Sequence, residues 1–153
     1  MRVSSDERPA PELTDSLGYL LKHAHLRLSE QTDKALAPLG LDAKELGILV
    51  VIAGPEPLSQ QQVAQQLGVD RTTMVAMLDT LEGKGIVSRH PHPDDRRRNV
   101  VELTGAGRDT FQRALRARDG AERGYLARLG ASDSQCLRNS LKTVVAGPDG
   151  SSR

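Results

Sequence analysis

The chain has 153 residues and a formal net charge of +1, which fits one domain and argues against binding polyanions through a broad basic field. Aromatic residues make up only 2% of it, so aliphatic side chains must fill the core, which favours helices. The single cysteine excludes a disulfide within the chain, and no run approaches the roughly 18 apolar residues of a membrane-spanning helix. The start lacks the basic, apolar and small-residue pattern of a secretory leader. We therefore expect a cytoplasmic protein without a membrane partner.

The first part of the chain predicts an arm and two helices. Residues 1–12, rich in Ser, Pro and charge, predict a disordered arm. Apolar residues then recur at helical spacing over about seven turns, from residue 13 to residue 37. This stripe consists of Leu13, Leu17, Leu20, Leu21, Ala24, Leu28, Ala35 and Leu36. Asp42 and Glu45 have capping-box spacing, so a short buried helix should follow.

Two capped helices are predicted between residues 59 and 83. Ser59 and Gln62 have capping-box spacing, and Gly68 suits the end of the first helix. Asp70 suits the N-cap of the second helix. The buried stripe of that second helix consists of Met74, Met77, Leu78 and Leu81. Two short helices joined by a tight turn form the helix-turn-helix pattern.

The second helix begins with three polar residues that the stripe does not need. In a helix-turn-helix, these N-terminal residues meet base edges in the major groove. Arg71 suits guanine, while Thr72 and Thr73 can hydrogen-bond to a base or touch a thymine methyl group. Ser59 and Gln60, at the start of the preceding helix, could meet phosphate. The alternative is a solvated helix start that contacts nothing.

A hairpin with arginines at its tip follows. Ile86-Val87 and Val100–Leu103 predict two short strands, and prolines in the intervening segment mark a turn. The tip presents Arg96, Arg97 and Arg98, and a narrow minor groove attracts inserted arginine. Asp95 more plausibly steadies these arginines than touches DNA, because phosphate repels a carboxylate. The alternative is a solvated charged loop.

The stretch from Leu58 to Thr104 resembles the winged helix of the MarR (multiple antibiotic resistance regulator) family. The wing signature is matched by Asp95, Arg97 and Leu103-Thr104. The segment at the end of the recognition helix is matched by Leu81-Glu82, Lys84-Gly85 and Ile86-Val87. The similarity extends, more weakly, over roughly residues 13–146. It implies a dimer joined by its terminal helices, a pseudo-palindromic operator and a small anionic or phenolic effector.

The last part of the chain predicts two more helices. Thr104 suits the N-cap of a long helix, and Ser132 with Gln135 the start of the last one. Gly120 and Gly124 either admit a close neighbour or weaken the long helix. The terminal helices have apolar stripes without partners in a small winged helix, so a two-fold homodimer should cover them. The alternative is a monomer whose terminal helices cover each other. Residues 147–153 predict a disordered tail.

Other candidate sites rest on histidine and cysteine. His23 and Arg27, one helical turn apart, could line an effector pocket of the kind that the resemblance implies. His90 and His92 share a strand face and, with the nearby acids of the wing, could hold a divalent metal. The alternative, which we favour, is a wing that is broken by prolines and holds no metal. Cys136 is best explained as a small apolar residue.

We therefore predict a mainly α fold with a small β-wing. The single domain would span residues 13–146, with the DNA-binding winged helix at about 42–104 and dimerisation helices at about 13–37 and 105–146. The protein would be a dimeric repressor that binds double-stranded DNA and is released by a small-molecule effector. No catalytic motif is present, so we expect neither an enzyme nor a cofactor. The alternative is a winged-helix protein-interaction module, which the balanced charge of residues 58–104 keeps open.

Overall fold

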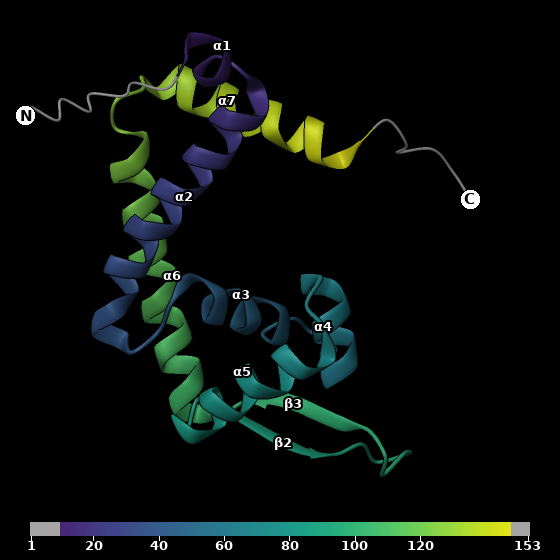
Figure 1. Cartoon of the computed structure of the whole chain (residues 1–153). Helices are drawn as coiled ribbons and strands as arrows, with labels where there is room; N and C mark the ends of the chain where they lie inside the picture. The colour runs from purple at the N-terminus through teal and green to yellow at the C-terminus, as the bar shows by residue number, and fades with distance from the viewer. Residues whose placement is uncertain (1–9, 148–153) are drawn as a thin grey trace, which may run out of the picture.

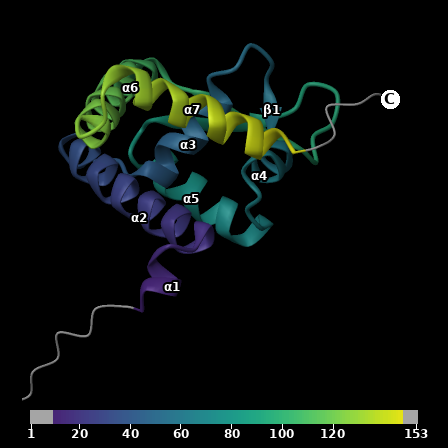
Figure 2. The same cartoon turned by 90° about the horizontal axis from the view of Figure 1, so that it is seen from above.

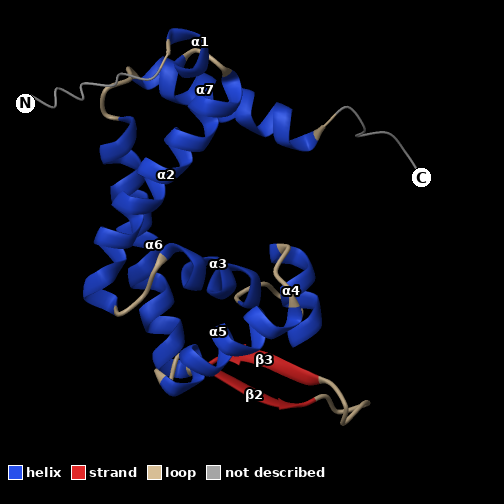
Figure 3. Cartoon of the chain, viewed as in Figure 1, coloured by secondary structure: helices blue, strands red, loops and turns tan. Residues whose placement is uncertain are grey.

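A computed structural model describes residues 10–147. In chain order the elements are α1 (Pro11–Thr14), α2 (Leu17–Leu36), η1 (Ala37–Leu39), α3 (Ala43–Ile52), β1 (Leu58–Ser59), α4 (Gln60–Leu67), α5 (Arg71–Gly83), β2 (Val87–Pro91), β3 (Asn99–Leu103), α6 (Gly105–Leu126) and α7 (Ala131–Ala146) (Figure 1). The predicted disordered ends lie outside the described residues except at their inner edges, where Pro11 and Glu12 belong to α1 instead of the predicted arm. The predicted fold class is confirmed, since the described part of the chain is mostly helical with a small three-stranded sheet (Figure 3).

The molecule has two parts. A compact lobe holds α3, α4, α5 and the sheet, while α2 and α6 run side by side and form, together with α1 and α7, the arm (Figure 1). Helix α7 crosses the far end of this arm (Figures 1 and 2). Within the arm, the Tyr125 hydroxyl donates to the Ala24 carbonyl at 2.9 Å. None of the described helices is long and apolar enough to cross a membrane.

Side chains cap the helices of the lobe as predicted. Both capping boxes are complete, Asp42 with Glu45 at the start of α3 and Ser59 with Gln62 at the start of α4. The Thr104 hydroxyl accepts from the Gly107 N–H at 2.9 Å and so caps α6. Gly68 ends α4 with a positive φ of 63°, which a residue without Cβ adopts freely. These caps set where α3, α4 and α6 begin and where α4 ends.

The terminal helices differ from the prediction at two points. The first helix is interrupted, because Ser16 breaks off α1 and caps α2 by accepting from the Tyr19 N–H at 3.3 Å. The last helix begins at Ala131 with Gly130 at the N-cap, so the Ser132 cap is wrong. The Gln135 side chain bonds Asn139, one turn further along, instead of completing a capping box. Helix α6 continues without interruption through Gly120 and Gly124.

The wing carries one strand more than the predicted hairpin. The sheet has the order β1-β3-β2, with all pairs antiparallel. Strand β2 pairs with β3 from Val87↔Leu103 to Pro91↔Asn99, and β1 adds Leu58↔Val101. Strand β1 has only two residues, too few to show alternation in a sequence. It ties the start of α4 to the middle of β3.

The core lies in the lobe and at the near end of the arm. Met74, Leu78 and Leu81 of α5 are fully buried against residues of α3, α4 and the sheet. Phe111 and Ala114 of α6 close the core from the arm side. Its fully buried large side chains are Leu36, Ile48, Leu49, Val63, Met74, Leu78, Leu81, Val87 and Val101. The core therefore fixes α5 relative to the sheet, and so positions the wing.

One buried carboxylate belongs to this framework. Glu45 is 8% exposed, and its Oε1 accepts from Lys84 Nζ at 2.7 Å. Lys84 Nζ also donates to the Gly40 carbonyl at 2.6 Å. The second carboxylate oxygen of Glu45 accepts from the Asp42 N–H in the capping box. The end of α5 is thus joined to the start of α3 through a satisfied ion pair.

Candidate nucleic-acid interface

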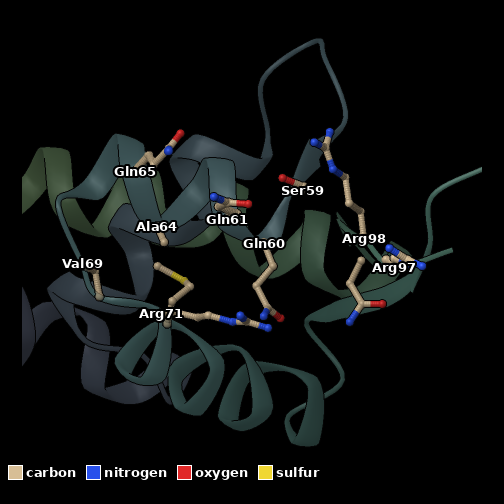
Figure 4. A pocket seen from close by; sticks show the side chains of 11 residues that line it. Ser59, Gln60, Gln61, Ala64, Gln65, Val69, Arg71, Arg97 and Arg98 are labelled. Atoms are coloured by element: carbon tan, nitrogen blue, oxygen red, sulfur yellow. The ribbon is translucent and has the colours of Figure 1, made fainter. Parts of the chain in front are cut away.

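A groove of about 420 Å³ runs between α4, the start of α5 and the wing (Figure 4). It gathers five of the predicted DNA-contacting residues: Ser59, Gln60, Arg71, Arg97 and Arg98. Arg71 points from α5 towards the wing arginines, and Gln60 lies between them (Figure 4). Residues more than 35 positions apart in the chain therefore line one surface, because the core holds α5 and the sheet together.

The start of α5 divides its three polar residues into two kinds. Thr73 belongs to the cap, since its N–H and hydroxyl both donate to the Asp70 carboxylate at 2.9 and 2.7 Å. The hydroxyl and N–H of Thr73 lower the pKa of Asp70 below its ordinary value. The exposed side chains of Arg71 and Thr72 make no hydrogen bond within the described part of the chain. The sequence-based prediction assigned all three residues to base contacts. In the structure only Arg71 and Thr72 keep side chains that are free to meet a ligand.

The start of α4 presents a helix N-terminus to the groove. The Ser59 hydroxyl accepts from the Gln62 N–H at 3.2 Å and is therefore occupied by the cap. Gln60 stands one position further and directs its carbonyl oxygen towards Arg89 at 3.4 Å. Backbone N–H groups at such a helix start attract anions. This end of the groove suits a phosphate.

The wing tip is organised by Asp95. Its carboxylate accepts from the Arg97 N–H at 3.0 Å and lies 3.7 Å from Arg98 Nε. The Asp95 N–H and carbonyl also bond within the tip, to His92 and Arg98. Among the described residues, the exposed guanidinium groups of Arg96 and Arg97 have no acidic partner. The tip thus holds three arginines outward while one carboxylate stays in the turn.

Sequence reasoning missed the residue that joins these elements. Arg89 of β2 is bonded to Asp79 and Glu82 of α5 and to Gln60 of α4. The Arg89 guanidinium lowers the pKa of Glu82, and the hydrogen bond to Glu82 raises the pKa of Arg89. One signal was available in the sequence, since a strand continued two residues beyond the predicted Ile86-Val87 puts Arg89 on the same face of the sheet as Val87.

Residues 41–98 match the model of the MarR family. The structure is also similar, with a TM-score of 0.84, to the transcriptional repressor CouR bound to a 23-mer DNA duplex. The two sequences are 34% identical over 91% of this chain and 99% of that one. The chain belongs to the MarR family. It is a transcription regulator with the family's winged helix-turn-helix, as the resemblance implied.

Two further proteins are similar to this MarR-family regulator over most of its length. PecS of Dickeya dadantii, an HTH-type transcriptional regulator, is 28% identical over 91% of this chain and 86% of its own length. CouR from Rhodococcus jostii RHA1, bound to p-coumaroyl-CoA, is similar with a TM-score of 0.76. That structure is 26% identical over 94% of this chain and 100% of its own. The likeness therefore covers the arm as well as the lobe.

The remaining predicted site residues lie outside the groove or serve the wing itself. His23 and Arg27 are exposed on α2, and the His23 ring packs on Tyr19 with centroids 4.0 Å apart. His90 Nε2 lies 3.8 Å from Glu102 Oε1, and His92 Nδ1 accepts from the Asp94 N–H. No group of three potential metal ligands occurs among the described residues. Each wing histidine of this MarR-family protein thus has a partner within the wing.

Proposed function

We propose that this MarR-family protein is a dimeric repressor that binds a pseudo-palindromic operator and is released by a small-molecule effector. The observation that carries the proposal is the groove, in which Arg71 of α5 faces the same space as Arg97 and Arg98 of the wing. Regulation would come from binding rather than from catalysis. We propose a cytoplasmic location, since such a regulator must reach its DNA.

The contacts follow from the geometry of each element. Arg71 and Thr72 would read base edges in the major groove, with Thr73 holding the helix start through its cap. Arg96, Arg97 and Arg98 would reach the adjacent minor groove. Ser59 and Gln60 would place the N-terminus of α4 on a phosphate. Asp95 would steady the wing arginines without touching DNA.

The arm supports the dimer. Its exposed large apolar side chains include Leu13, Leu17, Leu20, Leu21 and Leu26 near the start, and Leu129, Leu137, Leu141, Val144 and Val145 near the end. The terminal helices pack on each other but leave these stripes open, which disfavours the monomer. A two-fold contact between copies would cover them. It would also present two copies of α5 about 34 Å apart, one turn of DNA.

The effector is the least specified part of the proposal. His23 and Arg27 stand on α2, where a cation and an imidazole would suit a small anionic or phenolic ligand. One similar repressor binds p-coumaroyl-CoA, which combines a phenolic group with anionic phosphates. Such a ligand would lower operator affinity only by binding the released state more tightly than the DNA-bound state.

Fluorescence anisotropy tests the DNA contacts. The duplex is the DNA immediately upstream of the gene, titrated across a salt series with scrambled competitor. Specific binding should resist the competitor and fall steeply with salt. Arg97→Ala should weaken binding and reduce the salt slope by about one for each subunit of the dimer. The matched control, Arg113→Ala on α6, should leave both unchanged.

The protein-interaction module remains the second candidate, because cationic and acidic residues are equal in number between Leu58 and Thr104. A selection from random duplexes distinguishes the two. Recovery of a palindrome supports the repressor. If no sequence is enriched and binding does not depend on salt, the DNA proposal fails and a protein partner becomes the better explanation.

A further inference from the structure

Arg89 lies where the three proposed contact elements meet. It belongs to β2, opposite Val101 of β3. Its Nε and Nη2 donate to Glu82 Oε2 at 3.1 and 2.6 Å, and Nη2 also donates to Asp79. Its Nη1 donates to Gln60 Oε1 at 3.4 Å. The Arg89 N–H reaches Glu82 Oε1 at 3.4 Å, so the strand itself is joined to α5.

The exposure of Arg89 sets it apart from the wing arginines. Its side chain is 18% exposed, whereas that of Arg98 is 65% exposed. All three guanidinium nitrogens are directed at other parts of the same lobe. Arg89 would have to release these partners before it could reach a phosphate. Its place in the lobe is therefore that of a connector.

We propose that Arg89 is a positioning residue, which fixes the angle between α5, the first turn of α4 and the wing without contacting DNA. We call Arg89, Asp79, Glu82 and Gln60 the Arg89 latch. The inference rests on the proposed function, because the contacts that it positions are those with the operator.

The geometry explains why this angle matters. Arg71 projects from one end of α5, and Asp79 and Glu82 lie two and three turns further along that helix. On the wing, the latch holds the middle of β2, while Arg97 lies beyond the end of that strand at the tip. A small tilt at Arg89 becomes a larger displacement at Arg97. The latch also neutralises two acids that would otherwise repel the phosphate backbone.

Glu82→Gln gives the sharper of two tests, because the two explanations predict opposite signs. If only charge mattered, removing a negative charge from the lobe would tighten operator binding. The latch instead predicts binding about threefold to tenfold weaker, because a neutral amide accepts weaker hydrogen bonds from Arg89 than the carboxylate does. The matched control is Asp94→Asn at the wing tip, where the carboxylate has no ion-pair partner among the described residues. It should tighten binding by up to about twofold.

Arg89→Gln separates positioning from phosphate contact. We expect its operator affinity to fall roughly tenfold with an unchanged salt slope, whereas Arg97→Ala lowers the slope by about one for each subunit of the dimer. A slope reduced by about one per subunit in Arg89→Gln, or tighter binding by Glu82→Gln, would overturn the proposal. A charge exchange, Arg89→Glu with Glu82→Arg, should recover part of the affinity.

Hydrogen exchange of the free protein tests the latch without DNA. In Glu82→Gln, amides of β2 and of the end of α5 should exchange faster, while those of α3 keep their wild-type rates. Unchanged exchange in β2 would contradict the latch even if the protein proved not to bind an operator. Faster exchange together with an absence of operator binding would support the latch and refute the proposed repressor. The melting temperature of each variant shows that it is folded.

Discussion

The lobe and the arm use the same apolar periodicity but bury it differently. In the lobe, Met74, Leu78 and Leu81 recur at helical spacing and are each 0% exposed. In the arm, Leu137 and Leu141 recur at the same spacing and are 39% and 38% exposed. The lobe finds its covering atoms in its own chain. The arm leaves a stripe that its own helices do not cover.

This difference limits what can be inferred from a hydrophobic stripe in a sequence. A stripe indicates that one face of a helix avoids water, but it does not identify the chain that covers the face. The lobe has polar caps at its helix ends and a closed core, so it is complete as a single copy. The arm has long helices with large exposed leucines, and it is completed by the proposed dimer. Substitutions in the two parts should therefore differ in kind.

The largest effect is expected from charge on the stripe of α7. Leu137→Glu with Leu141→Glu would place two carboxylates in the proposed interface, and we expect monomers. Operator affinity should then fall by roughly 100-fold, since each half-site must be bound separately. Sedimentation gives the oligomeric state and anisotropy the affinity. Asn139→Glu with Thr143→Glu, at the same spacing on another side of α7, should change neither; a dimeric leucine variant would refute the interface.

Truncation of one leucine in each part compares the two kinds of burial directly. Leu78→Ala removes a fully buried side chain of the lobe, and should lower the free energy of unfolding by about 2–5 kcal/mol while leaving the dimer dissociation constant unchanged. Leu137→Ala should raise that dissociation constant about tenfold and disturb the fold of the lobe little. Urea unfolding and sedimentation measure the two quantities. Equal changes in both quantities would erase the distinction between lobe and arm.

Two glycines at the start of α6 test the junction between arm and lobe. A Cβ on Gly107 would lie 1.9 Å from the Ile86 carbonyl oxygen, so Gly107→Ala should cost about 1–3 kcal/mol of folding stability. A Cβ on Gly105 would meet nothing within 4 Å, so Gly105→Ala should be neutral or stabilise by up to about 1 kcal/mol. Thermal unfolding of both variants shows the contrast. Equal melting temperatures would mean that α6 moves away from the sheet at little cost.

The sequence predicted the lobe better than the arm because the lobe is specified locally. Asp42, Ser59, Asp70 and Thr104 each cap a helix with a partner three residues away, and such spacing is visible in the chain. Ser132 and Gln135 have the same spacing, but the predicted cap at Ser132 was wrong. There Gly130 takes the N-cap position with an extended backbone, and no described side chain caps the helix start. Capping spacing in the sequence therefore predicted the helix starts of the lobe correctly but not the start of α7.

The candidate site was predicted in its exposed residues and missed in its internal connections. Arg71 and Arg97 could be named from their places in a motif, and the structure brings them to one groove. The bonds from Arg89 to Asp79 and Glu82 depend on how β2 packs against α5, which periodicity does not give. The hydrogen bond from the Thr73 hydroxyl to Asp70 likewise depends on three-dimensional geometry, so the sequence alone did not show that this hydroxyl is occupied.

The smallest effect concerns pH and belongs to the lobe alone. Hydrogen bonds from Thr73 lower the pKa of Asp70 in the folded state. A depressed folded pKa stabilises the fold above the unfolded pKa, about 3.9, and this stabilisation is lost as pH falls through the folded pKa. Asp70→Asn keeps a good N-cap without the charge. Wild type should thus be slightly more stable than Asp70→Asn at pH 6, and this advantage should shrink below about pH 4.

Urea unfolding of both proteins between pH 6 and pH 3 measures that difference, and the dimer dissociation constants should agree because Asp70 lies in the lobe. Thr73→Val offers the matched control, since it removes the hydroxyl that contributes most to lowering the pKa of Asp70. Its pH dependence should fall between those of wild type and Asp70→Asn. Parallel curves for wild type and Asp70→Asn over the whole range would mean that the carboxylate at the start of α5 holds the helix no more firmly than a neutral amide does.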